Sequence, residues 1–156
     1  MNTLSPESYM DVRSACPDKV VSAARAVSNI KRGSRVFIGS ACGEPRHLIH
    51  TLARDAAMQD IMLYQMLSFT LAEYMEDKEF LKRFQLKLFF ISAGMRKAAF
   101  EGKIDYIPAY LSDIPDLFDS NQIGLDTALI QVSPPDKFGF CSLGISVDVT
   151  RSGCKN

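Results

Sequence analysis

The chain has 156 residues, enough for one domain with a substantial hydrophobic core. Its 18 basic and 18 acidic residues cancel, which argues against a protein that binds nucleic acid or an anionic membrane through a basic patch. No apolar run approaches the roughly 18 residues of a membrane span, and the N-terminus lacks the apolar segment of a signal peptide.

Residues 1–19 are polar and contain two prolines, so we expect a lead-in to the folded domain, with a short helix over residues 7–15. A longer helix is predicted over residues 20–33, because apolar residues recur on one face between Ser22 near its start and Gly33 at its end.

The stretch that follows predicts a strand, a small-residue turn and a helix. Residues 36–38 are a continuous apolar run, typical of a strand that is buried on both faces. Residues 39–43 are small and allow a tight turn, and Glu44 and Pro45 are residue types favoured in the first turn of a helix. We expect this helix to end near residues 55–57, and its first backbone N–H groups to be free for a ligand.

The rest of the chain alternates between apolar runs and helical patterns. Further strands are predicted over residues 61–67, 86–91, 106–111, 127–132 and 140–143. Helices are predicted over residues 78–84, 95–101 and 115–119. Pro108 cannot donate a hydrogen bond within a sheet, so the strand that contains it is expected at an edge or a bulge. Alternating strands and helices predict a mainly parallel sheet covered by helices.

Small-residue turns follow three of the predicted strands, at residues 39–45, 92–94 and 142–146. Arg96 accompanies the second turn and suits a carboxylate or a phosphate, although from this segment alone a solvated helix face is the simpler interpretation. The carboxyl ends of parallel strands meet at one edge of a sheet, so we expect the three turns to converge there on a ligand site.

Cysteine or histidine chemistry is a weaker hypothesis. The four cysteines contain no CxxC pair, so they are expected to be reduced thiols in a cytoplasmic protein. Cys42 lies at the start of a predicted helix and could act as a nucleophile with His47 or His50, but a small buried filler is the simpler interpretation. The two histidines could form one edge of a metal site, yet no second cluster completes it.

Three stretches of sequence carry a family resemblance. They are RVFIGSACGEPRHLIHTLA from residue 35, FFISAGMRKAAFEGKIDYIPAYLSDIPDLF from residue 89 and ALIQVSPPDKFGFCSLGISVD from residue 128. Together they resemble the N-terminal domain of the acetyl-CoA hydrolase/transferase family, over about residues 18–150. The resemblance implies a three-layer α/β/α fold with a mainly parallel sheet, shared by CoA-transferases and sugar-phosphate isomerases, over residues 20–156.

The resemblance also implies a mechanism. In this family a glutamate attacks an acyl-CoA thioester, forming an acyl anhydride and then a glutamyl-CoA thioester, from which a small carboxylate such as acetate takes the CoA. That glutamate lies in a C-terminal domain that we expect to be absent from these 156 residues. No catalytic residue and no metal ligand are therefore assigned here, coenzyme A is a substrate and not a bound cofactor, and the chain alone is expected to be inactive.

Substrate-binding residues carry over from the family by their positions in the motifs. The first loop supplies a pocket wall, and the later turns add four residues: Gly39, Ser40, Cys42, Gly43, Glu44 and Pro45, with Arg96, Ser142, Gly144 and Ser146. Glu44 matches the family's loop acid or amide, not its nucleophile. Residues 92–94 depart from the more usual Gly-x-Asn turn. Because loops lie at the surface, Ser40→Phe and Gly43→Val are expected to leave the fold largely intact.

Two functional hypotheses stand at this point. In the first, the chain is the N-terminal part of a CoA-transferase or acyl-CoA hydrolase. In the second, it is a non-catalytic ligand-binding or assembly domain derived from that family. In either case the face that normally meets the C-terminal domain is expected to be exposed and apolar, which predicts a homodimer.

Overall fold

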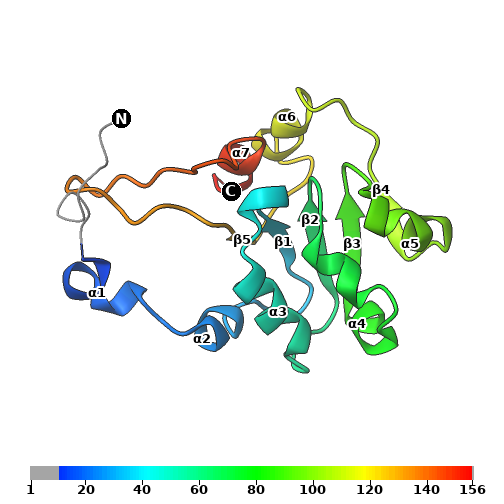
Figure 1. Cartoon of the computed structure of the whole chain (residues 1–156), viewed down its shortest axis with the longest axis horizontal. Coiled ribbons are helices and arrows are strands. Elements are labelled where there is room, and N and C mark those ends of the chain that lie inside the picture. The colour runs from blue at the N-terminus through cyan, green and yellow to red at the C-terminus, as the bar shows by residue number, and fades with distance from the viewer. Residues whose placement is uncertain (1–10, 156) are drawn as a thin grey trace.

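The computed structural model of the chain describes residues 11–155, and they form a single sheet with helices on both faces. Five parallel strands pair in the order β4-β3-β2-β1-β5 (Figure 1). Their bounds are β1 Arg35–Ile38, β2 Ile61–Gln65, β3 Phe84–Leu88, β4 Ile104–Tyr106 and β5 Thr127–Leu129. The predicted α/β class and parallel sheet are therefore confirmed.

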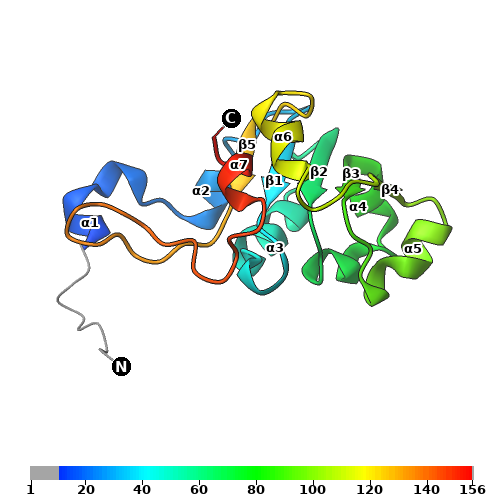
Figure 2. The ribbon, with the colours of Figure 1, turned by 90° about the horizontal axis from the view of Figure 1, so that it is seen from above.

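The helices are short. They are α1 Val12–Ala15, α2 Ala23–Val27, α3 Arg46–Arg54, α4 Lys78–Arg83, α5 Arg96–Phe100, α6 Ile114–Asp119 and α7 Thr150–Gly153. Single 3-10 turns lie at η2 Pro17–Lys19, η3 Ala41–Gly43, η4 Thr70–Tyr74 and η5 Ala93–Met95. Seen from above, α3 and α6 lie on opposite sides of the sheet (Figure 2). Among the described residues no helix is long and apolar enough to cross a membrane.

The alternation of side chains along β1 separates the core into two clusters. Val36 and Ile38 belong to a large cluster that α2, α3, α4 and α5 cover, and Phe37 belongs to a smaller one covered by α6 and α7. All three side chains are fully buried, as the continuous apolar run predicted. In the smaller cluster the rings of Phe37 and Phe118 meet edge to face, with centroids 5.7 Å apart.

The strand predicted over residues 140–143 is wrong. Residues 130–149 instead form an extended arm, which projects from the sheet on the same side as α1 (Figures 1 and 2). Hydrogen bonds within the arm tie its two sides together, among them those from Ser133 N to Ser142 O and from Asp136 N to Phe140 O, both 2.9 Å. The physical reason is that a short apolar run becomes a strand only where a neighbouring strand is available to pair with it.

Other element boundaries differ from the predictions for local reasons. Ser22 caps α2 as expected, but the helix ends at Val27, where Ser28 Oγ donates to the backbone of Arg25. Of the strand predicted over residues 106–111, only Tyr106 is in a strand, at the end of β4, which stops before Pro108 and lies at the sheet edge. Of the helix predicted over residues 7–15, the last four residues form α1, and residues 7–10 lie outside the described part of the chain.

Helix α7 was not predicted, because its residues are polar or small. Asp148 Oδ1 accepts hydrogen bonds from Val149 N and from both donors of Thr150, and so fixes the start of the helix. Gly153 then packs against the ring of Phe37, where an added Cβ would lie 2.6 Å from a ring carbon. Helix α7 can pack closely on the sheet because Gly153 has no side chain, and not because its residues are apolar.

Candidate functional site

Strand order places a topological switch point at the carboxyl end of β1. Strands β2, β3 and β4 follow one another on one side of β1, whereas β5 pairs on its other side. Ligands bind at such points in open α/β sheets, because the loops that leave the two neighbouring strands diverge there. Gly39 begins the loop at this point, and its N–H donates to Leu129 O across the junction at 2.9 Å.

The backbone of the loop after β1 is tied down. Gly43 N donates to Ser40 O at 2.9 Å and Glu44 N to Ala41 O at 3.2 Å, which forms the 3-10 turn η3. Ala41 has a φ of 49°, and its N–H donates to Leu67 O at 3.1 Å. The expectation that the first N–H groups of the predicted helix are free for a ligand is wrong for Glu44 and for Arg46, whose N–H donates to Glu44 O at 2.8 Å.

The turn at residue 146 packs directly on this loop. Ser146 Oγ donates to Ser40 O at 3.0 Å, and both side chains are buried. An added Cβ on Gly43 would lie 2.0 Å from Ser146 Oγ, so only glycine fits. Ser40 and Gly43 are buried beneath the returning arm, so the premise that they lie at the surface is wrong, and Ser40→Phe and Gly43→Val are expected to disturb the fold.

Glu44 is a buried carboxylate that joins two loops. Its side chain, 5% exposed, accepts hydrogen bonds from Gln65 Nε2 at 3.0 Å and Phe69 N at 2.7 Å through Oε1. Its other oxygen accepts from Thr70 N at 2.9 Å and Thr70 Oγ1 at 2.5 Å. Both carboxylate oxygens thus have two hydrogen-bond donors each, and the carboxylate holds the loop after β2 against the loop after β1.

These two loops enclose a pocket of about 320 Å³. Besides Glu44, it is lined by Ala41, Cys42, Arg46, Phe69, Thr70 and Glu73. Sequence reasoning identified Cys42 and Glu44 but missed the residues from the start of α3 and from the loop after β2. That second loop carries no glycine, so the search for small-residue turns passed over it. Its position, directly after a buried strand at the same edge, was the available signal.

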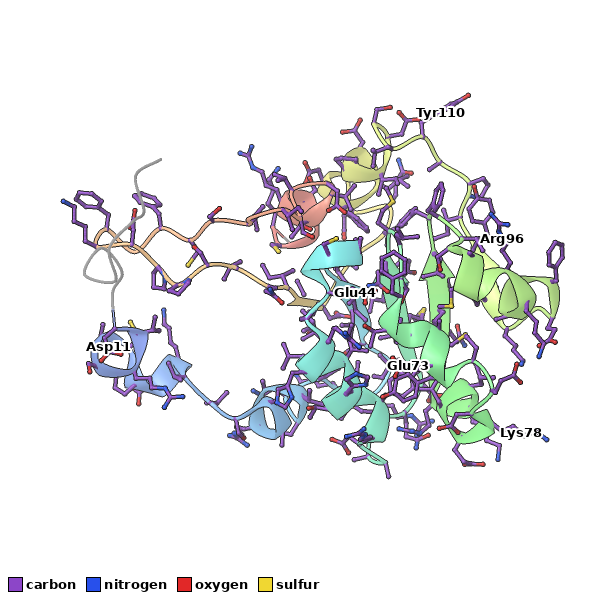
Figure 3. All side chains as sticks on the ribbon, in the orientation of Figure 1. Asp11, Glu44, Glu73, Lys78, Arg96 and Tyr110 are labelled. Carbon is purple, nitrogen blue, oxygen red and sulfur yellow. The ribbon has the colours of Figure 1, made fainter. Side chains whose placement is uncertain are left out.

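The other predicted site residues lie elsewhere. Ser92, at the turn after β3, donates to Ser68 O at 2.8 Å, which places that turn beside the loop after β2. Arg96 is exposed and lies farther toward β4, whereas Glu44 and Glu73 lie closer together near the middle of the molecule (Figure 3). Ser142 and Gly144 are exposed on the arm. Of the predicted site residues in the two later turns, only Ser146 therefore contacts the loop after β1.

Neither histidine is arranged as a metal site or as a general base for Cys42 would require. His47 is exposed, and His50 Nδ1 lies 2.6 Å from the Tyr74 hydroxyl. Burial raises the pKa of Tyr74, which keeps this hydroxyl protonated and able to donate to the imidazole. Among the described residues no group of three or more His, Cys, Asp or Glu could hold a metal ion. The four cysteines are unpaired, and Cys42 is exposed.

A model of the acetyl-CoA hydrolase/transferase N-terminal domain matches residues 1–155. The chain belongs to this family. The resemblance drawn from three stretches of sequence is thereby confirmed over nearly the whole chain.

This family member is similar to curated CoA-transferases. It is 36% identical over 141 residues to 4-hydroxybutyrate coenzyme A transferase of Clostridium kluyveri, covering 89% of this chain and 32% of that one. It is 42% identical over 131 residues to the succinyl-CoA:acetate/propanoyl-CoA:succinate CoA transferase of Fasciola hepatica, covering 81% and 27%. The chain thus spans about a third of the length of these relatives.

Solved structures agree with the fold. RipA from Yersinia pestis superposes with a TM-score of 0.79 at 28% identity, covering 90% of this chain and 35% of that one. The 4-hydroxybutyrate CoA-transferase of Porphyromonas gingivalis superposes with a TM-score of 0.71 at 24% identity, covering 92% and 32%, and supports the fold alone. The predicted CoA-transferase fold is therefore confirmed.

Proposed function

We propose that residues 20–156 are the N-terminal domain of a CoA-transferase or acyl-CoA hydrolase, and that they hold the acyl group of an acyl-CoA. The transfer proceeds through a glutamyl-CoA intermediate on a C-terminal domain, and the greater length of the relatives, of which this chain spans about a third, leaves room for such a domain. The acceptor is a small carboxylate such as acetate in a transferase, or water in a hydrolase. Coenzyme A is a substrate that leaves with the product.

One observation carries this proposal, the pocket between the loops after β1 and β2. Its volume of about 320 Å³ suits a short acyl group, since ligand pockets start at roughly 300 Å³. The half-exposed ring of Phe69 gives it an apolar wall, and the Glu44 hydrogen bonds fix the shape of its two loops. Such fixed walls align a thioester with a nucleophile that another domain presents.

The role of each predicted site residue follows from its position. Cys42 and Glu44 line the pocket, and Gly39, Ser40, Gly43 and Pro45 form the buried loop behind that wall. Ser146 supports the loop from outside. We assign Arg96, Ser142 and Gly144 to a more distant part of the substrate, the CoA moiety or the acceptor, since they lie on exposed segments.

The alternative is a non-catalytic ligand-binding or assembly domain. It is favoured by the exposed apolar side chains of the arm, Phe138, Phe140, Ile145 and Val147, each at least 59% exposed. We propose that the isolated chain forms a homodimer through such surfaces in the cytoplasm. Sedimentation velocity over a hundredfold range of concentration measures this, and a monomer throughout contradicts it.

A chimera tests the catalytic proposal. This chain replaces the corresponding third of the C. kluyveri relative, and transfer of CoA from butyryl-CoA to acetate is followed by product chromatography. The chimera is expected to transfer CoA, and the isolated chain to show none. Turnover by the isolated chain that is lost on mutating one of its own glutamates would overturn the proposal. A folded but inactive chimera would favour the alternative.

A further inference from the structure

We infer that Arg46 recognises a carboxylate at the far end of the acyl group, so that the pocket selects dicarboxylic acyl groups over monocarboxylic ones. The inference rests on the proposed function, because it assigns a substrate class to the same pocket. It names a cation that the sequence motifs did not single out. Arg46 is the first residue of α3 and lines the pocket.

The guanidinium of Arg46 is available to a ligand. Its described acidic partner is Glu73, across the pocket, with 3.8 Å between the nearest nitrogen and oxygen. The two side chains are 68% and 58% exposed, so water screens their attraction and the pair is held weakly. A ligand carboxylate that makes two parallel hydrogen bonds to the guanidinium would displace Glu73, because bidentate pairing is the stronger geometry.

The other acid that lines the pocket does not compete for this cation. Both oxygens of Glu44 already accept two hydrogen bonds each, from Gln65 at the end of β2 and from Phe69 and Thr70 in the loop after it. Its charge is therefore satisfied within the protein, and the pocket keeps one acid, Glu73, that must move when an anion enters. The balance between Arg46 and Glu73 sets how strongly a distal carboxylate is preferred.

The remaining walls fit the middle of a short acyl chain. Ala41 and the ring of Phe69 offer apolar surface, on which methylene groups can pack. The N-terminus of α3, a helix of nine residues, adds a favourable field for an anion placed beside Arg46. A carboxylate separated from the thioester by two methylenes would combine these contacts.

The test compares two thioesters that differ at one end. Butyryl-CoA and succinyl-CoA share the CoA moiety, and a terminal methyl group in the first is a carboxylate in the second. Affinities for the purified chain are measured by titration calorimetry with freshly prepared thioesters. The wild-type chain is expected to bind succinyl-CoA about tenfold more tightly, a factor that corresponds to roughly 1.4 kcal/mol.

Variants on the two halves of the ion pair should act in opposite directions. Arg46→Gln is expected to abolish the preference for succinyl-CoA and to spare butyryl-CoA, whereas Glu73→Gln is expected to increase it. Arg54→Gln, which removes an exposed cation from the other end of α3, is the matched control and should leave the ratio unchanged. Circular dichroism checks that each variant is folded.

The possible results distinguish a failure of the role of Arg46 from a failure of the acyl pocket itself. Equal binding of both thioesters, or a preference that survives Arg46→Gln, overturns the role of Arg46 and leaves the acyl pocket standing. Loss of the preference on Arg96→Gln alone would assign the cation to the turn after β3 instead, which also overturns the inference. If neither thioester binds the folded chain, the proposed function fails together with this inference.

Discussion

Replacing Glu44 by glutamine should destabilise the fold, although the two side chains have nearly the same shape. One carboxylate oxygen becomes an NH₂ group, which donates where the loop after β2 also donates. At the position of Oε1 the nitrogen would face Gln65 Nε2 and Phe69 N, neither of which can accept. At the position of Oε2 it would face Thr70 N and a hydroxyl that can turn and accept.

The second arrangement is therefore the better one, and its cost can be worked out. It leaves Thr70 N–H buried without an acceptor and turns the remaining contacts from charged to neutral. A hydrogen bond to a charged group contributes about 1.5–3 kcal/mol, so the total loss is about 2–4 kcal/mol. With a urea m-value of roughly 2 kcal/mol per molar, the unfolding midpoint falls by about 1–2 M.

Equilibrium urea unfolding followed by circular dichroism measures this change. Glu73→Gln removes the other acid of the pocket, whose side chain is 58% exposed, and serves as the matched control with little expected effect. Thr70→Val removes only the hydroxyl donor and should give an intermediate loss. Equal midpoints for Glu44→Gln and Glu73→Gln would refute the interpretation of Glu44 as the group that joins the two loops.

Two further predictions concern the contact between Gly43 and Ser146 and the thiol of Cys154 at the end of α7. Gly43→Ala should destabilise the chain by about 1–3 kcal/mol through overpacking against Ser146, and Ser146→Gly in the same chain should recover part of that loss in urea unfolding. Two independent losses that simply add would contradict the contact. Burial raises the pKa of the Cys154 thiol, so its iodoacetamide reaction should rise with pH and reach its midpoint above about pH 8.5. Mass spectrometry of the labelled peptide measures this, and a midpoint at or below that pH contradicts it.

The central strands were predictable because their burial is encoded in consecutive residues. Val36, Phe37 and Ile38 are apolar on both faces, so the sequence predicts a strand without reference to any distant partner. The run at residues 140–143 has a similar local pattern but no neighbouring strand, and it lies in the arm instead. Pairing depends on residues far away in the chain, which a local pattern does not contain.

The site was predictable in part for the same reason. Small residues marked the loop after β1, and the strand order then placed it at the switch point. The role of Glu44 depends on donors about 25 residues away, at Phe69 and Thr70, and no spacing rule indicates them. Arg96 was predicted from a cation beside a glycine turn, but this local pattern could not show that Arg96 lies exposed on α5, outside the pocket that Cys42 and Glu44 line.

The central claim is that the acyl group of an acyl-CoA binds between the loops after β1 and β2. The most direct test is a titration of the ¹⁵N-labelled chain with butyryl-CoA, followed by the positions of the backbone N–H signals in NMR spectra. We expect the largest shifts at residues 41–46 and 69–73, which line or flank the pocket of about 320 Å³. Shifts concentrated instead at the more apolar pocket of about 680 Å³ formed by residues 106–110, Asp113 and Leu117 would contradict the claim, as would no shifts at all.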